Sequence, residues 1–426
     1  AVYQVQPVLM ALPFVVLLFL WVCHDPFVLF WALVASIPWS IEYNFTESLG
    51  TDLPTEPLML LTSFATLCFL VYHRRKKPLA GITHSMLLLV LLLQVAWWIV
   101  SAYFSTNFVL SAKYVLAKGW YLGAFIATPY ILFRNPKHLV RTVQLLCASM
   151  MLLVARTMIL HAGYGFSFTG INPALAPHFR NHVNYSSVLT CILVLLVAGH
   201  HLARTPQRRQ LMKALIALSL SAIVLSYARG AWVALIAAGI VFLLLKRRLL
   251  VPAFFAAILC ASIGIYYLID SQRYMRFAGN FNQTVFHTDF REHLAATYQF
   301  KDLSNAERFY RWIAGVRMVK MNWATGWGPN TYVINYRHFT VPAFRTWVSD
   351  NPEKSTVHNY YLFTTIEQGF VGLFLLLLVT GYAFFIAQKI YHQSRDPLRR
   401  TTAAVCAAIL AIECTVLFSG LSLTHV

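Results

Sequence analysis

Charged residues are scarce in this 426-residue sequence. Asp, Glu, Lys and Arg make up 12% of it, whereas soluble domains carry about 25%. Hydrophobic residues make up 58%, and the mean hydropathy is +0.61. Long apolar runs such as Leu87–Val100 and Gly372–Phe385 need lipid or a very large core. The composition excludes an ordinary soluble domain and predicts an all-α polytopic integral membrane protein.

Acidic residues are the scarcest charged type, and common metal and nucleophile motifs are missing. The sequence has 15 Asp and Glu against 34 Lys and Arg. It contains no HExxH, CxxC, P-loop or GxSxG motif, and its loop carboxylates form no DxD or DxxD pair that would cage a divalent ion. The seven cysteines are scattered through apolar segments, which is typical of small core residues. We therefore expect no metal and no cofactor.

The excess of positive charge, +19 in all, has two interpretations. Lys and Arg in the loops of one side follow the positive-inside rule and contact anionic membrane lipids. Alternatively, some arginines on the other side hold an anionic substrate. Nucleic acid is not an expected partner, because the charge is divided among loops and no separate basic domain exists.

Apolar segments of membrane-spanning length recur along the chain and predict about twelve transmembrane helices. We expect a transmembrane bundle of about ten spans over residues 1–269, a large loop over 270–357 and two last spans over 358–426. The first two segments are short enough to form a bent pair. The segments are 8–22, 27–41, 57–72, 84–104, 112–133, 139–160, 183–202, 211–227, 230–246, 249–269, 358–387 and 402–421.

Five basic clusters predict the orientation of these spans. An even number of spans separates each cluster from the next, so all five lie on one side, which the positive-inside rule makes the cytoplasm. The 270–357 loop and both termini then lie on the opposite face. The clusters are Arg74–Lys77, Arg134/Lys137/Arg141, Arg204/Arg208/Arg209/Lys213, Lys246–Arg248 and Lys389/Arg395/Arg399/Arg400.

The long loop contains a predicted amphipathic helix over residues 305–320. Phe309, Trp312, Ile313 and Val316 are spaced i, i+3, i+4 and i+7, which gives one apolar face. The basic residues of the segment are distributed around the rest of the helix. One interpretation is therefore an interfacial helix that lies on lipid, with its basic side chains toward phosphates.

Basic side chains recur at the predicted outer ends of the spans. Arg180 and His182 precede a span, Arg229 lies at the tip of a helical hairpin, and Arg308 and Arg311 lie on the amphipathic helix. A single arginine at a helix end commonly reaches to lipid headgroups, and this is the alternative for each of them. Several arginines on one face would instead match phosphate oxygens and stay charged. Such a group would bind a lipid pyrophosphate and neutralise its departure without a metal.

His358 opens a predicted span and is followed at once by the polar Asn359. A histidine can take a proton from a sugar hydroxyl near neutral pH, although a histidine at a span entrance is often structural. Glu367 lies nine residues farther on, at membrane depth, where ionisable groups are usually functional or paired. The rise between His358 and Glu367 is about 13 Å, too long for a direct pair. We therefore expect Glu367 to have another partner, such as one of the outer arginines.

These residues resemble a known family. His358 and Asn359, nine further residues, then Gly369-x-x-Gly372 are similar to the H[NSQ]-x9-Gxx[GTY] signature of the O-antigen ligase superfamily. The members are polytopic enzymes that move glycans from undecaprenyl pyrophosphate. The histidine signature alone is moderately specific.

Three other motifs match the same superfamily in the same order. Arg308-x-x-x-Trp312 followed by GWGPN at 326–330 is similar to its R-xxx-W…G-x-G-x-[NG] pattern in the large periplasmic loop. SYARG at 226–230 is similar to its S-x-[ST]-RG hairpin, with Ala where Ser or Thr is common. The segment from Arg180 to Asn184 resembles its R-x-x-x-N element before a span.

The resemblance implies a GT-C-like membrane glycosyltransferase that is inverting and metal-independent. Its donor would be an undecaprenyl-pyrophosphate-linked glycan, and its site would face the periplasm from the bacterial inner membrane. By this resemblance His358 would be the base or the group that orients the acceptor, and Arg180 and Arg229 would hold the pyrophosphate. Arg308 would join them. Further substrate contacts are expected from Arg311, Asn359, His182, Trp312 and Glu367.

Three functions within the superfamily fit this reading. An O-antigen ligase transfers glycan to the lipid A-core oligosaccharide, and the basic outer surface suits that phosphorylated acceptor. An O-antigen polymerase and a protein O-oligosaccharyltransferase are the alternatives. From another class, a flippase for lipid-linked glycans would need ionisable residues along several helices, and the sequence has few. The oligomeric state and the acceptor sugar are not predicted.

Overall fold

The structure is a computed structural model. It describes residues 25, 27–46, 49–73, 85–270, 273, 303–345, 349 and 356–419, and most of these are helical. The predicted span at 8–22 and the basic cluster at 74–77 lie outside the described residues. So do the loop carboxylates at 289, 292, 302, 350 and 353.

The chain divides into two compact units, which are described separately. Unit 1 comprises Ala1–Thr83 and Leu116–Arg156, and unit 2 comprises His84–Val115 and Thr157–Val426. Two helices contribute to both, α5 (Phe108–Leu122) and α7 (Pro136–Gly163). The predicted boundaries at 269 and 357 follow membrane topology rather than compactness and stay a prediction.

Unit 1 is built from α3, which is long enough to span a membrane, and several shorter helices around a small apolar core. Leu33, Met59 and Ala124 form one buried cluster that joins three of its elements. A two-stranded antiparallel sheet, β1 (Ile41–Thr46) and β2 (Leu49–Leu53), occupies most of the segment that the sequence predicted as a loop. The helices are α2 (Val28–Ser36), η1 (Ile37–Trp39), α3 (Thr55–Tyr72), η4 (Gly123–Ala127) and α6 (Thr128–Leu132).

Unit 2 holds the remaining helices, including those that carry the candidate site. They are α4 (Met86–Tyr103), α8 (Ile171–Leu175), α9 (His182–Leu202), α10 (Pro206–Leu225), α11 (Arg229–Lys246), α12 (Leu250–Ile269), α14 (Leu303–Met321), α15 (Tyr332–Asn335), η7 (Tyr336–Phe339), η8 (Pro342–Phe344), α16 (Tyr360–Gln393) and α17 (Pro397–Ser419).

Nine helices in the described part of the chain are long and apolar enough to cross a membrane. The prediction of about twelve spans is therefore confirmed in part. The predicted span 211–227 forms α10, but Arg208, Arg209 and Lys213 make that helix too polar by the same measure. The predicted span 27–41 forms only the short apolar stretch Val28–Trp39. The protein is a multi-pass membrane protein.

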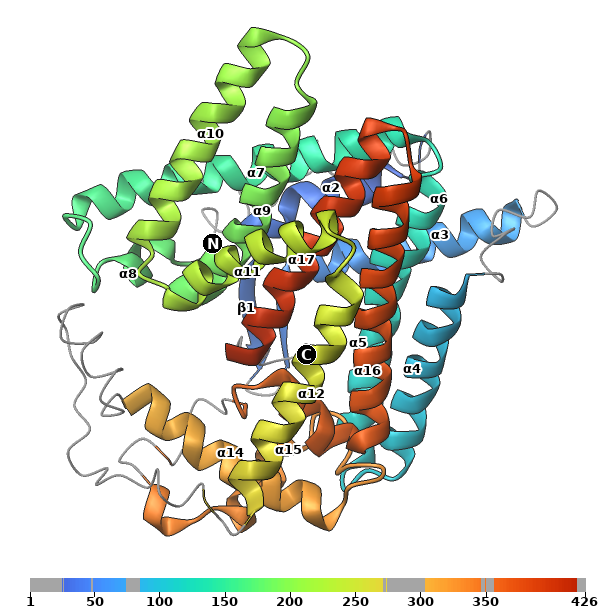
Figure 1. Ribbon diagram of the computed structural model, residues 1–426, viewed down its shortest axis with the longest axis vertical. Helices are drawn as coiled ribbons and strands as arrows, with labels where there is room; N and C mark the ends of the chain where they lie inside the picture. Colours follow the sequence, from blue (N-terminus) through green and yellow to red (C-terminus); the bar gives the residue numbers. More distant parts are fainter. Residues whose placement is uncertain are drawn as a thin grey trace, which may run out of the picture. The chain divides into compact units, whose positions relative to one another are not determined.

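Small residues let the helices of unit 2 approach closely. α17 packs against α9, α11 and α16, and Figure 1 shows α16 and α17 side by side. Ala234 and Ala238 of α11 meet Ala408 and Ile412 of α17 in one buried cluster. Helices in lipid gain little from burying apolar surface, so close contact between small residues stabilises them instead.

α16 separates the site from the basic turns. It has 34 residues, so it is about 50 Å long. α14 packs against its first turns, through Leu362 and Ile366, whereas Lys389 lies near its other end. Figure 1 shows α14 at the lower edge and the α9–α10 and α16–α17 turns at the upper edge.

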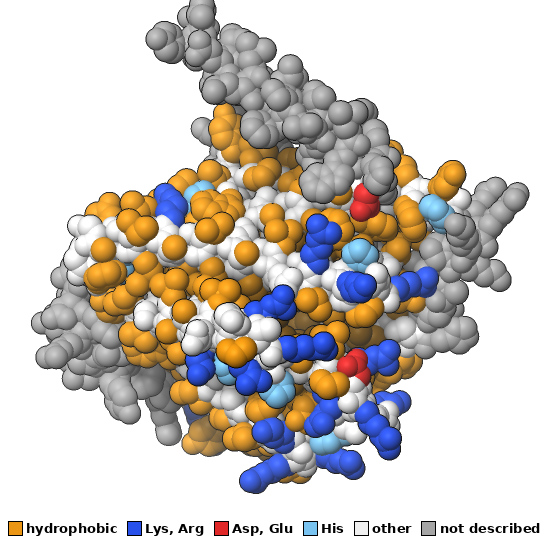
Figure 2. Space-filling view, turned by 90° about the horizontal axis from the view of Figure 1, so that it is seen from above, with side chains coloured by type: hydrophobic (Ala, Val, Ile, Leu, Met, Phe, Trp, Pro, Cys, Tyr) orange, Lys and Arg blue, Asp and Glu red, His pale blue; other side chains and the backbone are white. Residues whose placement is uncertain are grey.

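Exposed basic residues gather at the turns opposite α14. Figure 2, which looks down from the upper edge, shows many more Lys and Arg side chains than acidic ones on the visible face. In unit 2, the exposed basic residues of the α9–α10, α11–α12 and α16–α17 connections are Arg204, Arg208, Arg209, Lys213, Lys246–Arg248, Lys389, Arg395, Arg399 and Arg400.

The predicted loop helix exists, but it buries a different face. α14 spans Leu303–Met321, where 305–320 was expected. Its fully buried side chains include Tyr310, Ala314 and Met318, spaced i, i+4 and i+8. Of the expected apolar face, Ile313 is buried in the same cluster, whereas Phe309 and Trp312 are half-buried at its edge. An interfacial helix that merely lies on lipid is therefore the wrong description, because α14 is packed into a core.

Candidate functional site

The loop that follows α14 and contains GWGPN at 326–330 packs on a kink in α16; we call it the glycine-rich loop. The N–H of Trp327 donates to the carbonyl of Ile366 at 2.9 Å, and the N–H of Phe370 donates to the carbonyl of Trp323 at 2.8 Å. The kink lies at Gly369, with φ 70° and ψ −174°, a conformation essentially restricted to glycine. A Cβ there would lie 2.0 Å from the carbonyl oxygen of Ala324. The close approach of loop and helix thus explains one glycine of the family signature.

Glu367 holds the same loop from inside the kink. It is only 1% exposed, and its carboxylate accepts the N–H of Asn330 at 2.8 Å and that of Tyr332 at 3.1 Å. Asn330 has a φ of 63°, which presents its amide to the carboxylate. Two backbone donors of the loop are thus partners of Glu367, and an arginine partner remains a prediction. This geometry gives Glu367 a structural role, and its contact with substrate remains a prediction.

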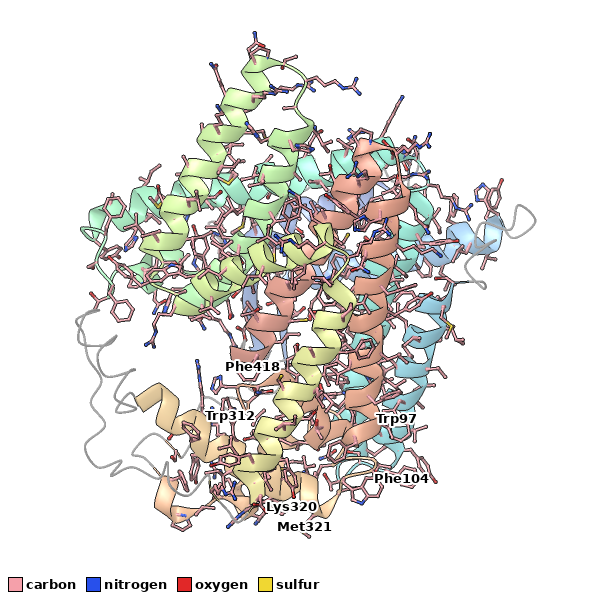
Figure 3. The ribbon with its side chains drawn as sticks, in the orientation of Figure 1. Trp97, Phe104, Trp312, Lys320, Met321 and Phe418 are labelled. Atoms are coloured by element: carbon pink, nitrogen blue, oxygen red, sulfur yellow. The ribbon has the colours of Figure 1, made fainter. Side chains whose placement is uncertain are left out.

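Side chains of α4 complete this docking and were missed at the sequence level. The Ser101 hydroxyl donates to the carbonyl of Glu367 at 2.9 Å and lies 3.0 Å from that of Thr325. The Trp97 indole donates to the carbonyl of Gln368 at 2.8 Å, and Figure 3 labels it on the helix beside α16. Three residues before it, the Gln94 amide meets the Gln368 side chain at 3.1 Å.

His358 and Asn359 form the entry to α16. Asn359 is the N-cap, and its Oδ1 accepts the N–H of Leu362 at 3.0 Å. This cap satisfies one of the amides that a helix start leaves without an internal partner. His358 precedes it with a φ of 54°, a left-handed conformation that is uncommon for a non-glycine residue. The half-buried imidazole is thus fixed just outside the helix.

Arg311 of α14 contacts His358 directly. Its Nη1 lies 2.9 Å from His358 Nε2 and also donates to the carbonyl of Thr356 at 3.2 Å. Its Nη2 forms an ion pair with Glu307 at 3.4 Å, and the Ser349 hydroxyl donates to the other Glu307 oxygen at 2.6 Å. Arg311 is 5% exposed and Glu307 is 7% exposed. A buried charge is expensive unless it is paired, and here the pairing is provided.

Two tyrosines pack close to this buried pair. Tyr332 and Tyr336 stack with ring centroids 5.1 Å apart, and each is 1% exposed. Burial raises the pKa of the Tyr332 phenol, although the nearby Arg311 guanidinium opposes that shift. The Tyr332 hydroxyl therefore stays protonated at neutral pH.

Trp312 and Arg308 occupy other faces of α14. The Trp312 ring lies 5.7 Å from Phe309 and 6.3 Å from Phe418 of α17, and Figure 3 shows Trp312 and Phe418 close together. Trp312 therefore joins α14 to the membrane helices by aromatic packing. Arg308 is half-buried. Their contacts with substrate remain predictions.

Arg229 is the first residue of α11 and follows a constrained turn. Ser226 is fully buried, and its hydroxyl donates to the carbonyl of Ile223 at 2.7 Å. Tyr227 has a φ of 58°, and its hydroxyl donates to the carbonyl of Phe166 at 2.7 Å. The N-cap residue is Ala228, whose side chain cannot bond the first amides. The start of α11 thus combines helix N–H groups with a guanidinium, which suits an anion.

His182 lies beside this turn through a shared aromatic ring, and Arg180 precedes His182 by two residues. The Phe168 ring lies 5.9 Å from His182 and 5.6 Å from Tyr227. The N–H of His182 donates to Asn172 Oδ1 at 2.9 Å. Arg180 is exposed. The structure therefore brings the segment before α9 close to the turn before α11, and Phe168 is a site residue that the motifs did not indicate.

Metal ligands do not cluster in the described part of the chain. No group of three or more His, Cys, Asp or Glu side chains there is arranged to hold a metal ion. The expectation of a metal-free reaction is thus left to experiment.

A comparison with known families matches this region. Residues 214–377 fit the family model described as O-antigen ligase. These residues belong to the O-antigen ligase family. No curated protein gave a significant match.

The O-antigen ligase domain contains most of the candidate site. It runs from within α10 to within α16 and includes Arg229, Arg308, Arg311, His358 and Glu367. Arg180 and His182 precede it. The family consists of membrane ligases of the glycosyltransferase type, whose general substrates are lipid-linked glycans and lipid A-core. The domain is accordingly a transferase-type domain of a multi-pass membrane protein.

Proposed function

We propose that this protein is an O-antigen ligase that transfers glycan from undecaprenyl pyrophosphate to the lipid A-core oligosaccharide with inversion. The observation that carries the proposal is the pairing of Arg311 with His358 at the entrance of α16. It lies inside the O-antigen ligase domain, which also contains Arg229. We assign the acceptor half of a glycosyl transfer site to this histidine, which a buried ion pair fixes, and the donor half to Arg229.

The reaction exchanges one bond of the anomeric carbon. The acceptor hydroxyl oxygen forms a bond to that carbon, and the bond from the carbon to the pyrophosphate oxygen breaks. The electron pair leaves with the pyrophosphate, and the hydroxyl loses its proton. Inversion places the attacking hydroxyl and the leaving pyrophosphate on opposite faces of the sugar. We therefore assign His358 to the acceptor side, as base or acceptor-orienting group, and the arginines to the lipid side.

The pyrophosphate is assigned to the start of α11. Arg229 and the first N–H groups of that helix present positive charge to an anion. Arg180, in the segment that shares Phe168 with this turn, adds a second guanidinium, and Arg308 a third. Guanidinium groups keep their charge and bind phosphate oxygens in pairs, so they stabilise the negative charge that the leaving group gains. No metal is needed for that purpose.

The site is assigned to the periplasmic face of the bacterial inner membrane. α14 packs at one end of α16, and the basic turns lie at its other end, about 50 Å away. Positively charged turns mark the cytoplasmic side. The glycine-rich loop and His358 then face the periplasm, where a translocated lipid-linked glycan is accessible.

One observation favours a transferase over a flippase. Among the described residues, the buried Asp, Glu, Lys and Arg side chains are Glu307, Arg311 and Glu367, and all three belong to the loop or to the α16 kink that holds it. A transport path would place such groups along the membrane helices. O-antigen polymerase and protein O-oligosaccharyltransferase use the same donor chemistry, so they are separated from the ligase by their products.

The proposal is tested in cells that depend on this protein for surface O-antigen. We expect His358→Ala to abolish surface O-antigen while the protein remains folded in the membrane. His338→Ala is the matched control, since His338 is an exposed histidine of the same loop. Near-normal surface O-antigen in His358→Ala cells would refute the assignment.

A further inference from the structure

Resting on the proposed function, we infer that Tyr227 is a positioning residue for the pyrophosphate site. Its hydroxyl donates to the carbonyl of Phe166 at 2.7 Å. This bond ties the turn before α11 to the α7–α8 loop, residues 164–170. The same loop contacts the start of α9, and it thereby holds Arg229 and the segment that contains Arg180 around one pyrophosphate.

The α7–α8 loop is itself held by His161, near the end of α7. His161 is 1% exposed, and its Nε2 lies 2.9 Å from the carbonyl oxygen of Ser167. A carbonyl oxygen only accepts, so Nε2 carries a proton and donates. The carbonyl of His161 accepts the N–H of Phe166 at 3.0 Å, and Phe166 has a φ of 53°. The carbonyl that Tyr227 contacts therefore belongs to a loop whose conformation is fixed by its own hydrogen bonds.

The α7–α8 loop and α8 also contact the start of α9. The Phe168 ring lies 5.6 Å from Tyr227 and 5.9 Å from His182. In α8, Asn172 Oδ1 accepts the N–H of His182 at 2.9 Å. His182 is the first residue of α9, and Arg180 precedes it by two residues. Figure 1 draws the end of α7, α8 and the end of α10 close together. The loop thus connects the two segments to which the pyrophosphate is assigned.

Tyr227 acts on the site through the backbone of its turn. It has a φ of 58° and lies two residues before Arg229, and its neighbour Ser226 is fully buried. Binding groups must be held within about 0.5 Å of their productive positions, and a displacement of about 1 Å can cost about 100-fold in rate. Loss of the bond to Phe166 would release the turn, and with it the first N–H groups of α11. The donor side of the reaction is then affected and the acceptor side is not.

The test removes the hydroxyl of Tyr227 and keeps its ring. We expect Tyr227→Phe to raise the KM for the lipid-linked donor about five- to tenfold, the factor expected for one neutral hydrogen bond. The Kd of undecaprenyl pyrophosphate for the purified protein should rise by the same factor, and the KM for lipid A-core should not change. A merely structural defect would lower the amount of active protein and leave these constants unchanged. Tyr164→Phe is the matched control, since Tyr164 is an exposed tyrosine of the same loop.

A second set of variants changes the loop from its other side. His161→Phe removes the hydrogen bond to Ser167, and we expect it to raise the donor KM as Tyr227→Phe does. His161→Gln should keep most of the donor affinity, because a glutamine amide can still donate. Tyr227→Phe should add little to the effect of Arg229→Lys, because residues that act as a unit are not additive.

The outcomes separate this inference from the function on which it rests. If the wild-type protein forms no glycan-bearing lipid A, the proposed function fails, and the Kd of undecaprenyl pyrophosphate still tests the role of Tyr227. If the donor KM and this Kd are the same in Tyr227→Phe and the wild type, the inference is wrong. Additive effects of Tyr227→Phe and Arg229→Lys would also overturn it, because Tyr227 would then act independently of Arg229.

Discussion

Gly369→Ala should release the glycine-rich loop from α16. A Cβ at this position would lie 2.0 Å from the carbonyl oxygen of Ala324 and 2.8 Å from that of Trp323. Both are backbone atoms, so no side-chain rotation relieves the overlap. Alanine would also have to adopt a φ of 70° with a ψ of −174°, a strain of about 1–3 kcal/mol.

The stability of the docked loop follows from the hydrogen bonds that its release would break. Three backbone hydrogen bonds join loop and kink, from Trp327, Gly328 and Phe370, at 2.8 to 2.9 Å. At about 1 kcal/mol each, they stabilise the docked loop by about 3 kcal/mol. The carboxylate of Glu367 would lose its two amide donors as well. The strain and the backbone overlap of Gly369→Ala offset this stabilisation, so opening of the loop becomes easier by about 3 kcal/mol, which corresponds to roughly 100-fold faster amide exchange.

Hydrogen exchange in detergent or nanodiscs measures this directly. We expect the amides of Trp327, Gly328 and Tyr332 to exchange about 100-fold faster in Gly369→Ala, with transfer activity lost in parallel. Gly239→Ala in α11 is the matched control, since a Cβ there meets no atom within 4 Å. Unchanged protection of the loop amides in a folded Gly369→Ala protein would refute the reasoning.

Three further predictions concern the ends of the site. Arg229→Lys should lower the transfer rate at least about tenfold, because a point charge replaces a donor that can form two hydrogen bonds at once. Arg317→Lys, on the exposed side of α14, is the control and should leave the rate unchanged. Full activity of Arg229→Lys in the transfer assay would indicate that Arg229 only contacts lipid headgroups. Asn359→Ala should lower stability by about 1 kcal/mol by removing the cap of α16, and Asn359→Ser should restore most of it; equal melting temperatures would contradict the cap assignment. Finally, EDTA should not inhibit transfer, and inhibition that added divalent ion reverses would overturn the metal-free proposal.

The helices of unit 2 were predictable because each carries its own signal. The segment predicted at 183–202 forms α9 at His182–Leu202, and the amphipathic segment 305–320 forms α14 at Leu303–Met321. Length, apolarity and polar residues at the ends determine such helices locally. Basic turns likewise predicted which connections share one end of α16.

The face of α14 was not predictable from its own periodicity. The sequence shows an apolar stripe through Phe309 and Trp312, yet the structure buries Glu307 and Arg311. The partners that make this burial tolerable, His358 and Ser349, are 47 and 42 residues away from Arg311 and Glu307 respectively. Local pattern reasoning has no access to partners at such separations.

The partners of Glu367 were missed for a related reason. Every residue except proline has a backbone N–H group. No residue type in the sequence therefore indicates that two such groups will donate to this carboxylate. A signal did exist in α4, where Gln94, Trp97 and Ser101 are spaced i, i+3 and i+7 within an apolar span. This polar stripe marks the face that docks on α16.

The most direct test of the central claim uses purified components. The protein, reconstituted in vesicles, is mixed with undecaprenyl-pyrophosphate-linked glycan and lipid A-core in the presence of EDTA, and glycan-bearing lipid A is followed on a gel. The account predicts this product with the wild type and its loss with His358→Ala. Longer glycan on the undecaprenyl carrier would instead identify a polymerase. Movement of the lipid across the membrane without any product would contradict the transferase assignment altogether.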